Sequence, residues 1–447
     1  AHIGRIPRNM NRFFAEAIDI RTHPIKKAKK KTQEEYLMAF TYVINKTINE
    51  MNYHQVKIKE CAMEHLRFYQ NQLFADVPTA NRNEKQEINC LAKFARSWRC
   101  KYRYMLVCDI ALILFDELWT CRAVEIMKEC LPAKYRTELE QVLLLLQNRQ
   151  NVREKYFSIF PLAEQYWANK DFFSKENRKI IVTANMSAGK STLINALIGK
   201  PVARTSQEAC TGNICYFYNK AYEDGNIYLL TQSLNMRATA DDLYGYDWNG
   251  SVFIASYFVG IVPDIPRLCI VDTPGVDAGL YKEHSKYAHE ALLNDSYDTI
   301  IYVVSPTRLG TDAEKAHLQW VAQHLQKDKI IFVLNKLDDY HDFSDSIEES
   351  VHDLKEDLLK MGFENPVVCP ISAYFSYLLK LRMTGQAFSE DEADEYALYS
   401  KKFMRSSYDL SPYYEGVQCL STDSEEIALS KRVGLYGLEK MLYGGRL

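Results

Sequence analysis

A run of eight residues, Ala-Asn-Met-Ser-Ala-Gly-Lys-Ser at 184–191, has the composition of a phosphate-binding loop. It lies between an apolar run at 180–182 and a helix-like segment at 192–197. In a P-loop, backbone N–H groups at the start of a helix converge on the β-phosphate, so the backbone must come close. The predicted phosphate-binding residues are Asn185, Met186, Ser187, Ala188, Gly189, Lys190, Ser191 and Thr192.

Three residues of this loop have separate predicted roles. Gly189 allows the close approach, Lys190 is expected to reach the β- and γ-phosphate oxygens, and Ser191 is expected to ligate Mg²⁺. Ala184 stands where the motif usually begins with glycine. Its methyl group is tolerable only if the local φ is negative or the loop shifts slightly, so we expect weaker binding rather than loss.

A second segment, Asp-Thr-Pro-Gly at 272–275, ends the strand-like run 268–271. Its Asp272 is predicted to bind Mg²⁺ through water. The N–H of Gly275 is predicted to meet the γ-phosphate and to move when that phosphate leaves. This segment is therefore the predicted switch II.

A third segment, Asn-Lys-Leu-Asp at 335–338, follows the apolar run 330–334 and selects the base. The Asp338 carboxylate can accept hydrogen bonds from both N1–H and the N2 amino group of guanine, and adenine offers no such pair of donors. The alkyl stem of Lys336 would lie over the base. The predicted base-binding residues are Asn335, Lys336, Asp338, Ser372 and Ala373, the last two presenting a backbone N–H to the guanine O6.

The Mg²⁺ shell also needs a threonine between the P-loop and switch II. Thr205 and Thr211 compete for this role, and both can also be read as ordinary loop residues. We favour Thr211 because it lies just before the strand-like run 213–218. The predicted metal ligands are Ser191, Thr211 and Asp272, and the predicted catalytic residues are Ser187, Lys190 and Thr211.

The residue after Gly275 is Val276, where Ras-type switches carry a glutamine that positions the attacking water. Hydrolysis must therefore depend on backbone groups, on another loop or on a partner. Ser187 is the nearest polar candidate.

Short apolar runs alternate with helical segments after Lys179. This alternation predicts an α/β P-loop domain with a doubly wound, mostly parallel sheet, and the nucleotide at the carboxyl ends of its strands. Two stretches are expected as insertions: 221–260, with an added hairpin, and 385–424, with an acidic surface segment. Residues 426–443 read as one closing helix. The predicted strands are 179–183, 213–218, 268–271, 299–304, 329–334 and 366–370.

The earlier part of the chain has helical spacing. Thr32 and Glu35 form a capping-box pattern, and apolar residues follow at steps of three and four from Leu37 to Leu73, with an interruption at Gln55. If continuous, that helix would span about 55 Å. Further helical stretches are expected at 88–130 and 135–168. The predicted domains are a basic lead at 1–31, an all-α helical bundle or stalk-like domain at 32–174, and the GTPase domain at 175–447.

Composition limits the function classes. The formal net charge is −3, which gives no chain-wide reason to bind nucleic acid, and no nucleic-acid partner is expected. The eleven cysteines include no Cys-x-x-Cys pair, which favours reduced thiols in a cytoplasmic protein. The most apolar stretch, 104–119, carries three acidic residues, so no transmembrane helix is expected.

Taken together, the motifs resemble those of the dynamin superfamily, particularly bacterial dynamin-like GTPases. The P-loop and its helix, 186–199, and the Asp-Thr-Pro-Gly segment carry the resemblance. It implies that Ser187 stabilises charge developing between the β- and γ-phosphates. It also implies that two GTPase domains dimerise across their nucleotides, and that helices couple this to an assembly or membrane-remodelling movement. A second dynamin-like subunit is a further partner that it implies.

Two features depart from that family. Ala184 replaces the usual glycine, and no long helical trunk or lipid-binding paddle follows residue 447. Either the chain is truncated or this member does not tubulate membranes. A basic run at 26–31 could contact an anionic membrane at about 1 kcal/mol per charge, and a solvated lead into a helix is the favoured reading.

Three hypotheses follow. The first is a Mg²⁺-dependent, dynamin-like GTP hydrolase that is cytoplasmic or peripheral at the membrane. The second is a slow GTP-dependent switch or scaffold that acts on a protein partner. The third, ranked lowest, is a membrane or nucleic-acid adaptor that GTP only regulates.

Overall fold

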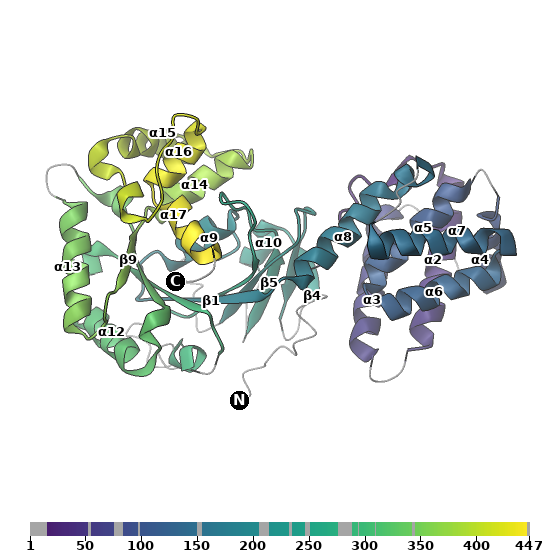
Figure 1. The fold of residues 1–447 in the computed structure, drawn as a ribbon, viewed down its shortest axis with the longest axis horizontal. Helices are drawn as coiled ribbons and strands as arrows, with labels where there is room; N and C mark the ends of the chain where they lie inside the picture. Colours follow the sequence, from purple (N-terminus) through teal and green to yellow (C-terminus); the bar gives the residue numbers. More distant parts are fainter. Residues whose placement is uncertain are drawn as a thin grey trace. The chain divides into compact units, whose positions relative to one another are not determined.

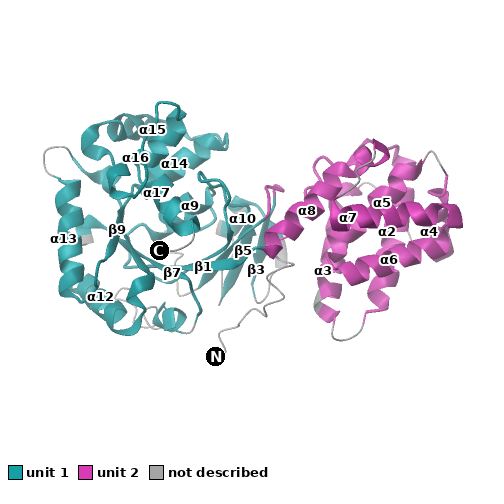
Figure 2. Ribbon diagram, in the orientation of Figure 1, with its two compact units in different colours: residues 1–4, 175–220, 226–447 teal, residues 5–174, 221–225 magenta. Residues whose placement is uncertain are grey.

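The computed structural model describes most of the chain in two compact units (Figure 2). The sheet unit comprises the described residues of 175–220 and 226–444, and the helical unit those of 16–174 and 221–225. The described ranges are 16–51, 55–75, 84–96, 99–149, 154–204, 214–231, 235–245, 251–275, 288–293, 295–308, 310–341 and 345–444.

The helical unit packs around one central helix, α5 (Cys100–Leu114). Every residue from Arg103 to Leu114 is buried, and α2, α3, α6, α7 and α8 contact this helix. Its Asp109 accepts hydrogen bonds from Tyr69 Oη at 3.3 Å and from Tyr36 Oη, and its carboxylate lies 3.0 Å from His23 Nε2. The other helices are α2 (Lys30–Asn49), α3 (Val56–Leu73), α4 (Glu84–Lys93), α6 (Glu117–Cys130), α7 (Arg136–Asn148) and α8 (Phe160–Ser174).

Several helical predictions are refined or corrected by the structure. The helical segment from Leu37 to Leu73 is not continuous: it forms two packed helices, α2 and α3, with the break just before Val56, beside the interruption noted at Gln55. Helix α2 starts at Lys30, and its N-cap makes no side-chain hydrogen bond, so Thr32 and Glu35 do not form a capping box. Glu35 is instead buried, where it pairs with Lys93 and Arg99. The expected helices at 88–130 and 135–168 are likewise divided, into α4 to α6 and into α7 and α8.

The sheet unit is built on a nine-stranded sheet in the order β4-β3-β5-β2-β6-β1-β7-β8-β9 (Figure 1). The runs predicted from apolar residues form its central strands and one edge, whereas β3 and β4 form the other edge. The strands are β1 (Asn177–Ala184), β2 (Cys215–Asn219), β3 (Ile227–Leu230), β4 (Asn235–Ala238), β5 (Val252–Ser256), β6 (Arg267–Asp272), β7 (Thr299–Val304), β8 (Ile330–Leu334) and β9 (Val367–Pro370).

The sheet is mixed rather than simply parallel. Strands β6, β1, β7, β8 and β9 run parallel to one another, but β2 pairs antiparallel with β6, and β3 pairs antiparallel with β4 and β5. Because antiparallel neighbours can be joined by a short turn, β3 leads directly into β4. The hairpin expected at 221–260 is thus a three-stranded edge, with β5 between β3 and β2.

Helices cover both faces of the central strands. Figure 1 draws α9, α14 and α17 on one side and α12 on the other. In β1, Ile180, Val182 and Ala184 join the core that includes α9 and α17, while Thr183 faces α12. The helices are α9 (Lys190–Ile198), α10 (Ala240–Gly245), α12 (Asp312–His324), α13 (Ile347–Lys360), α14 (Ala373–Met383), α15 (Glu390–Phe403), α16 (Glu425–Arg432) and α17 (Leu435–Tyr443).

The last part of the chain also differs from expectation. The acidic stretch that begins at Ser389 is largely exposed, as expected of a solvated surface segment, and it is also helical: Ser389 and Glu392 form a capping box at the start of α15. The single closing helix expected at 426–443 is broken into α16 and α17 at Gly434, where φ is +86°. A Cβ atom at this position would lie 2.4 Å from the Pro370 carbonyl oxygen, so glycine lets α17 approach β9.

Candidate nucleotide-binding site

The predicted P-loop lies between the end of β1 and the start of α9, as its motif requires. Ala184 ends β1 opposite Val303 and is not among the described non-glycine residues with positive φ, so the structure meets the condition under which its methyl group is tolerable. Gly189 has a φ of +88°, and a Cβ atom there would lie 2.3 Å from Asn335 Nδ2. Glycine is therefore required at that position.

Lys190 and Asp272 meet at the start of α9. Their ammonium and carboxylate groups form an ion pair, and the two side chains are only 11 % and 14 % exposed. Strand β6 brings Asp272 into parallel register with Val182. The adjacent Thr273 fixes this end of the strand, since its Oγ1 donates a 3.0 Å hydrogen bond to the Val182 carbonyl. The side chain predicted to bind the phosphates, Lys190, and the one predicted to bind Mg²⁺, Asp272, therefore lie in contact.

The Asp-Thr-Pro-Gly segment runs against the P-loop. A Cβ atom on Gly275 would lie 3.2 Å from Met186 Cγ and 3.5 Å from Met186 Cα. The backbone N–H of Gly275 therefore belongs to the same site as the phosphate-binding loop. Ser191 and Thr192 lie in the first turn of α9 and are half-buried.

Asn335 joins the phosphate-binding and base-binding loops. Its side chain is 2 % exposed. The Nδ2 group donates a 3.0 Å hydrogen bond to the Ala188 carbonyl, and Oδ1 accepts a 2.9 Å hydrogen bond from Ala373 N. Both ends of the amide are satisfied by backbone groups, so this one side chain fixes the spacing between the two loops.

The predicted guanine-reading residues also come together. Ser372 is fully buried at the N-cap of α14, and its Oγ donates a 2.6 Å hydrogen bond to Asp338 Oδ1. Burial raises the pKa of the Asp338 carboxyl, and the Ser372 hydrogen bond opposes that rise. From α15, Lys402 donates to the carbonyl oxygens of Asp338 and Tyr340, so the expected surface insertion supports this loop.

A buried ion pair holds the helices behind these loops. Lys380 of α14 and Glu439 of α17 are both fully buried, and the ammonium also donates a 2.7 Å hydrogen bond to the Leu197 carbonyl in α9. Glu439 Oε2 accepts a 2.7 Å hydrogen bond from Ile261 N. This pair therefore ties the P-loop helix to the helix that follows Ser372.

Three residues from the sequence analysis lie outside the described part of the chain: Thr205, Thr211 and Val276. The assignment of a threonine in switch I remains a prediction. So does the consequence for hydrolysis of having Val276 in place of a glutamine. Ser187 is described, with a φ of +65°, and Lys336 has the same positive φ beside Gly189.

Sequence reasoning missed three residues beneath the P-loop: Tyr302, Glu314 and His317. Glu314 Oε2 accepts a 2.7 Å hydrogen bond from Asn185 Nδ2, and Glu314 is 1 % exposed. The only signal in the sequence is Thr311 three residues earlier, a capping-box pattern that predicts a solvent-facing carboxylate. Thr311 Oγ1 does cap Glu314 N, but the carboxylate points inward.

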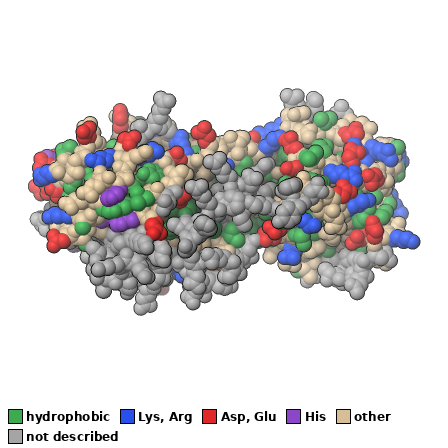
Figure 3. All heavy atoms as spheres, turned by 90° about the horizontal axis from the view of Figure 1, so that it is seen from below, with side chains coloured by type: hydrophobic (Ala, Val, Ile, Leu, Met, Phe, Trp, Pro, Cys, Tyr) green, Lys and Arg blue, Asp and Glu red, His purple; other side chains and the backbone are tan. Residues whose placement is uncertain are grey.

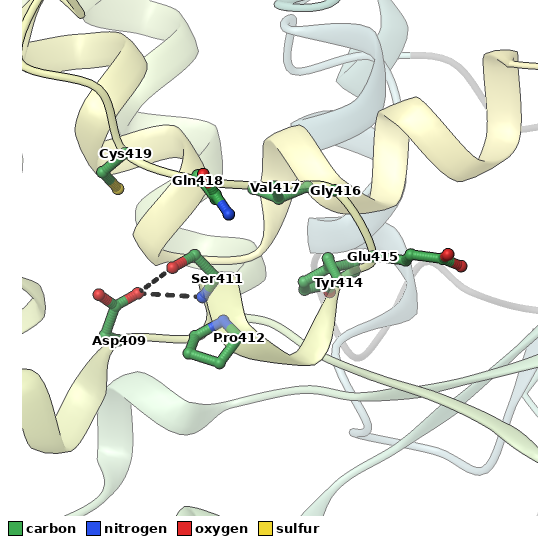
Figure 4. Close-up of a pocket in the computed structure, with 9 residues that line it drawn as sticks. All are labelled: Asp409, Ser411, Pro412, Tyr414, Glu415, Gly416, Val417, Gln418 and Cys419. Atoms are coloured by element: carbon green, nitrogen blue, oxygen red, sulfur yellow. Dashed lines mark hydrogen bonds between the residues drawn. The ribbon is translucent and has the colours of Figure 1, made fainter.

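A cavity of about 620 Å³ lies elsewhere in the sheet unit, lined by residues between Asp409 and Cys419 (Figure 4). None of the predicted nucleotide residues lines it. The Asp409 carboxylate accepts hydrogen bonds from Ser411 N and Oγ and pairs with Arg432, so its charge is already compensated.

The comparison with protein families identifies the kind of domain that carries this site. Residues 179–336 match the family described as 50S ribosome-binding GTPase, a range that runs from β1 into the guanine motif. The chain carries a GTPase domain. Domains of this kind hydrolyse GTP to GDP and phosphate.

Two curated proteins resemble parts of this GTPase. One is a probable transmembrane GTPase, FZO-like and chloroplastic, from Arabidopsis thaliana, 28 % identical over 57 % of this chain and 26 % of its own length. The other is an uncharacterised protein in the xynA 3′ region of Caldicellulosiruptor, 25 % identical over 51 % of this chain and 55 % of its own length. The chain thus spans about a quarter and about half of these relatives.

Two solved structures overlap the GTPase domain in part. The G domain of the FeoB iron transporter of T. maritima is 15 % identical, covers 50 % of this chain and 99 % of its own, and has a TM-score of 0.24. Era from Aquifex aeolicus, bound to GDP and AlF4⁻, is 18 % identical, covers 48 % and 58 %, and has a TM-score of 0.27. The fold assignment rests on the strand order above and not on these overlaps.

Proposed function

We propose that this chain is a Mg²⁺-dependent, dynamin-like GTP hydrolase, in which bound nucleotide drives dimerisation of sheet units and movement of the helical unit. One observation carries the coupling. The turn between β2 and β3, residues 221–225, belongs to the helical unit although both flanking strands belong to the sheet unit.

The turn is held by several hydrogen bonds in the helical unit. Tyr222 Oη donates a 2.7 Å hydrogen bond to the Ala17 carbonyl, and Asp224 Oδ2 accepts a 3.0 Å hydrogen bond from Ile18 N. From α8, Gln165 Oε1 accepts a 3.1 Å hydrogen bond from Tyr222 Oη. Asp224 is 1 % exposed and its hydrogen bond is buried, whereas the two hydrogen bonds of Tyr222 are partly buried.

Two segments of the chain link the nucleotide site to this turn or to a helix that contacts it: strand β2, and helix α8 just before β1. Strand β2 follows the segment in which switch I is predicted and ends three residues before Tyr222. Helix α8, which contributes Gln165, ends at Ser174, three residues before β1 and its P-loop. A change in either loop therefore has a short covalent route to the helical unit, which supports nucleotide-dependent movement.

The residues of the site fit Mg²⁺. Mg²⁺ in phosphate-binding sites takes one or two protein oxygens together with phosphate oxygens and water, and the Ser191 hydroxyl and Asp272 carboxylate are oxygen donors of this kind. When bound, the ion would neutralise charge on the phosphates. The described residues contain no group of three or more His, Cys, Asp or Glu that could hold a metal alone, which a shared site of this kind does not need.

Contact with an anionic membrane, made from the cytoplasmic side, is the second part of the proposal. The lysines of the basic run are all exposed: Lys26, Lys27, Lys29, Lys30 and Lys31. The name of the Arabidopsis relative, a probable transmembrane GTPase, also supports a membrane role. In the described residues no helix is both long and apolar enough to cross a bilayer. Figure 3 shows basic and acidic side chains interspersed over the described part of one face, which does not favour nucleic acid.

The alternative is a slow GTP-dependent switch that acts on a protein partner without remodelling membranes. The absence of a glutamine at position 276 favours this alternative, because that glutamine positions the attacking water in Ras-type switches. A slow switch does not need a dimer to replace it.

Sedimentation velocity in Mg²⁺ with GDP or with a non-hydrolysable GTP analogue tests the proposal, with Lys190→Ala as the control. We expect dimers with the analogue, monomers with GDP and monomers of the variant in both. Monomers in every condition, with the analogue shown to be bound, would favour the switch.

A further inference from the structure

Helix α12 reaches the start of the P-loop through a buried hydrogen bond. Asn185 Nδ2 donates to Glu314 Oε2 at 2.7 Å, and the two residues are 8 % and 1 % exposed. The other carboxylate oxygen, Oε1, accepts a 2.8 Å hydrogen bond from Tyr302 Oη on β7. Asn185 is the first residue after β1, so this contact acts where the chain leaves the sheet.

The next turn of α12 makes a second contact with the same strand end. His317 Nε2 lies 3.4 Å from Thr183 Oγ1, and its ring lies 5.3 Å from the Tyr302 ring. Burial lowers the pKa of His317 to about 3, so the imidazole is neutral near pH 7. Thr183 and Tyr302 are direct neighbours in the sheet. Helix α12 therefore contacts both the end of β1, at Thr183, and the start of the P-loop, at Asn185.

A hydrogen bond between a buried amide and a buried carboxylate holds its groups in place strongly. Removing one partner leaves the other desolvated and unpaired, which costs more than the net energy of the bond. The backbone of Asn185 is thereby fixed, and only a few residues later the chain takes positive φ values at Ser187 and Gly189. Convergence of the loop's N–H groups on a phosphate depends on where this sequence of turns begins.

We propose that Glu314 is a positioning residue that acts through Asn185: it holds the start of the P-loop in its phosphate-binding conformation, so that losing the contact weakens nucleotide binding more than it slows hydrolysis. The inference rests on the assignment of residues 184–191 as the nucleotide loop. It adds a role for α12, which carries none of the motif residues.

Exchanging the two groups gives the sharpest test. Asn185→Asp places two carboxylates against each other, whereas Asn185→Asp combined with Glu314→Gln restores one amide and one carboxylate with the same total charge. We expect the single variant to raise the Kd of a fluorescent GDP analogue about tenfold, the effect of roughly 1.4 kcal/mol. The exchanged pair should return to within about threefold of the wild type, and kcat for GTP should change less than Kd in both.

Further variants separate positioning from folding. Asn185→Ala removes the contact without adding charge and should also weaken binding. Glu314→Gln alone keeps an acceptor for Asn185 and a donor for Tyr302, so its Kd should stay near that of the wild type. Tyr302→Phe removes the other hydrogen bond of Glu314 and should lower the melting temperature without a matching change in Kd.

The outcomes distinguish the inference from the site assignment. If wild type and Lys190→Ala bind the GDP analogue equally, the nucleotide site itself is wrong. If the wild type binds normally but Asn185→Asp and Asn185→Ala leave Kd unchanged, Glu314 has no positioning role. A weak single variant that the exchanged pair fails to rescue would also overturn the proposal.

Discussion

Ser372 donates a 2.6 Å hydrogen bond from Oγ to Asp338 Oδ1, and so joins the two loops predicted to read guanine. Because Ser372 also caps α14, the carboxylate is held relative to a helix that packs on the P-loop helix. The base-reading and phosphate-binding parts of the site are thereby held together.

Asp338→Asn is predicted to change base preference. Asparagine keeps one oxygen that can accept hydrogen bonds from Ser372 and from N1–H, but its amide NH₂ replaces the oxygen that accepts from the N2 amino group of guanine. We expect weaker GTP binding and a gain for xanthine nucleotides, which present an acceptor in place of the N2 donor. Competition of GTP and XTP for the site measures this. Unchanged GTP preference would remove Asp338 from base recognition.

The same substitution is predicted to affect the stability of the nucleotide-free protein. Burial raises the folded-state pKa of Asp338 above its unfolded value, so the ionised carboxyl costs stability at neutral pH. That cost falls away as the pH drops through the folded pKa and is gone below the unfolded value. Asp338→Asn should therefore raise the melting temperature at pH 7, and the difference should shrink as the solution is acidified. A variant that melts lower at pH 7 would contradict this account.

Ser187 is predicted to act in turnover through its hydroxyl. Two variants separate the hydroxyl from the backbone, because Ser187 has a φ of +65° that glycine adopts freely and alanine does not. We expect Ser187→Gly and Ser187→Ala both to lower kcat more than they raise Kd. Loss in the alanine variant alone would show that backbone strain, and not the hydroxyl, is responsible.

Gly189 is predicted to be essential for binding because of space as well as conformation. Gly189→Ala would place a Cβ atom 2.3 Å from Asn335 Nδ2, whereas Gly385, also with positive φ, has nothing within 4 Å of such an atom. Both alanine variants should lose about 1–2 kcal/mol of stability from the left-handed backbone. Only Gly189→Ala should lose nucleotide binding, measured by titration calorimetry with GDP. Equal binding by both would argue against the close approach at the P-loop.

The sequence was most informative where one local pattern has one structural outcome. Apolar runs located the central strands to within a residue or two because both faces of those strands are buried. The P-loop, Asp272 and Asn335 were predicted from spacing that follows from the chemistry of phosphates and guanine. The structure brings Lys190 to Asp272 and Asn335 to the P-loop, and the roles of these residues stay predictions.

Long-range pairing was less predictable. The apolar pattern of a buried strand does not depend on the direction in which the strand runs. The antiparallel pairing of β2 with β6 could therefore not be predicted from the sequence. The acidic stretch after Ser389 was predicted only as a solvated surface segment, and its capping box shows that it is also the start of a helix. Glu314 was not singled out from the sequence, and only the approach of α12 to β1 places its carboxylate beside Asn185.

The most direct test of the central claim is steady-state GTP hydrolysis in Mg²⁺ over a hundredfold range of protein concentration, with and without anionic liposomes, using Lys190→Ala as the blank. A self-activating dynamin-like GTPase predicts that turnover per molecule rises with concentration or with lipid. Low turnover that stays constant across the range, together with tight GTP binding, would contradict the account and indicate a slow switch.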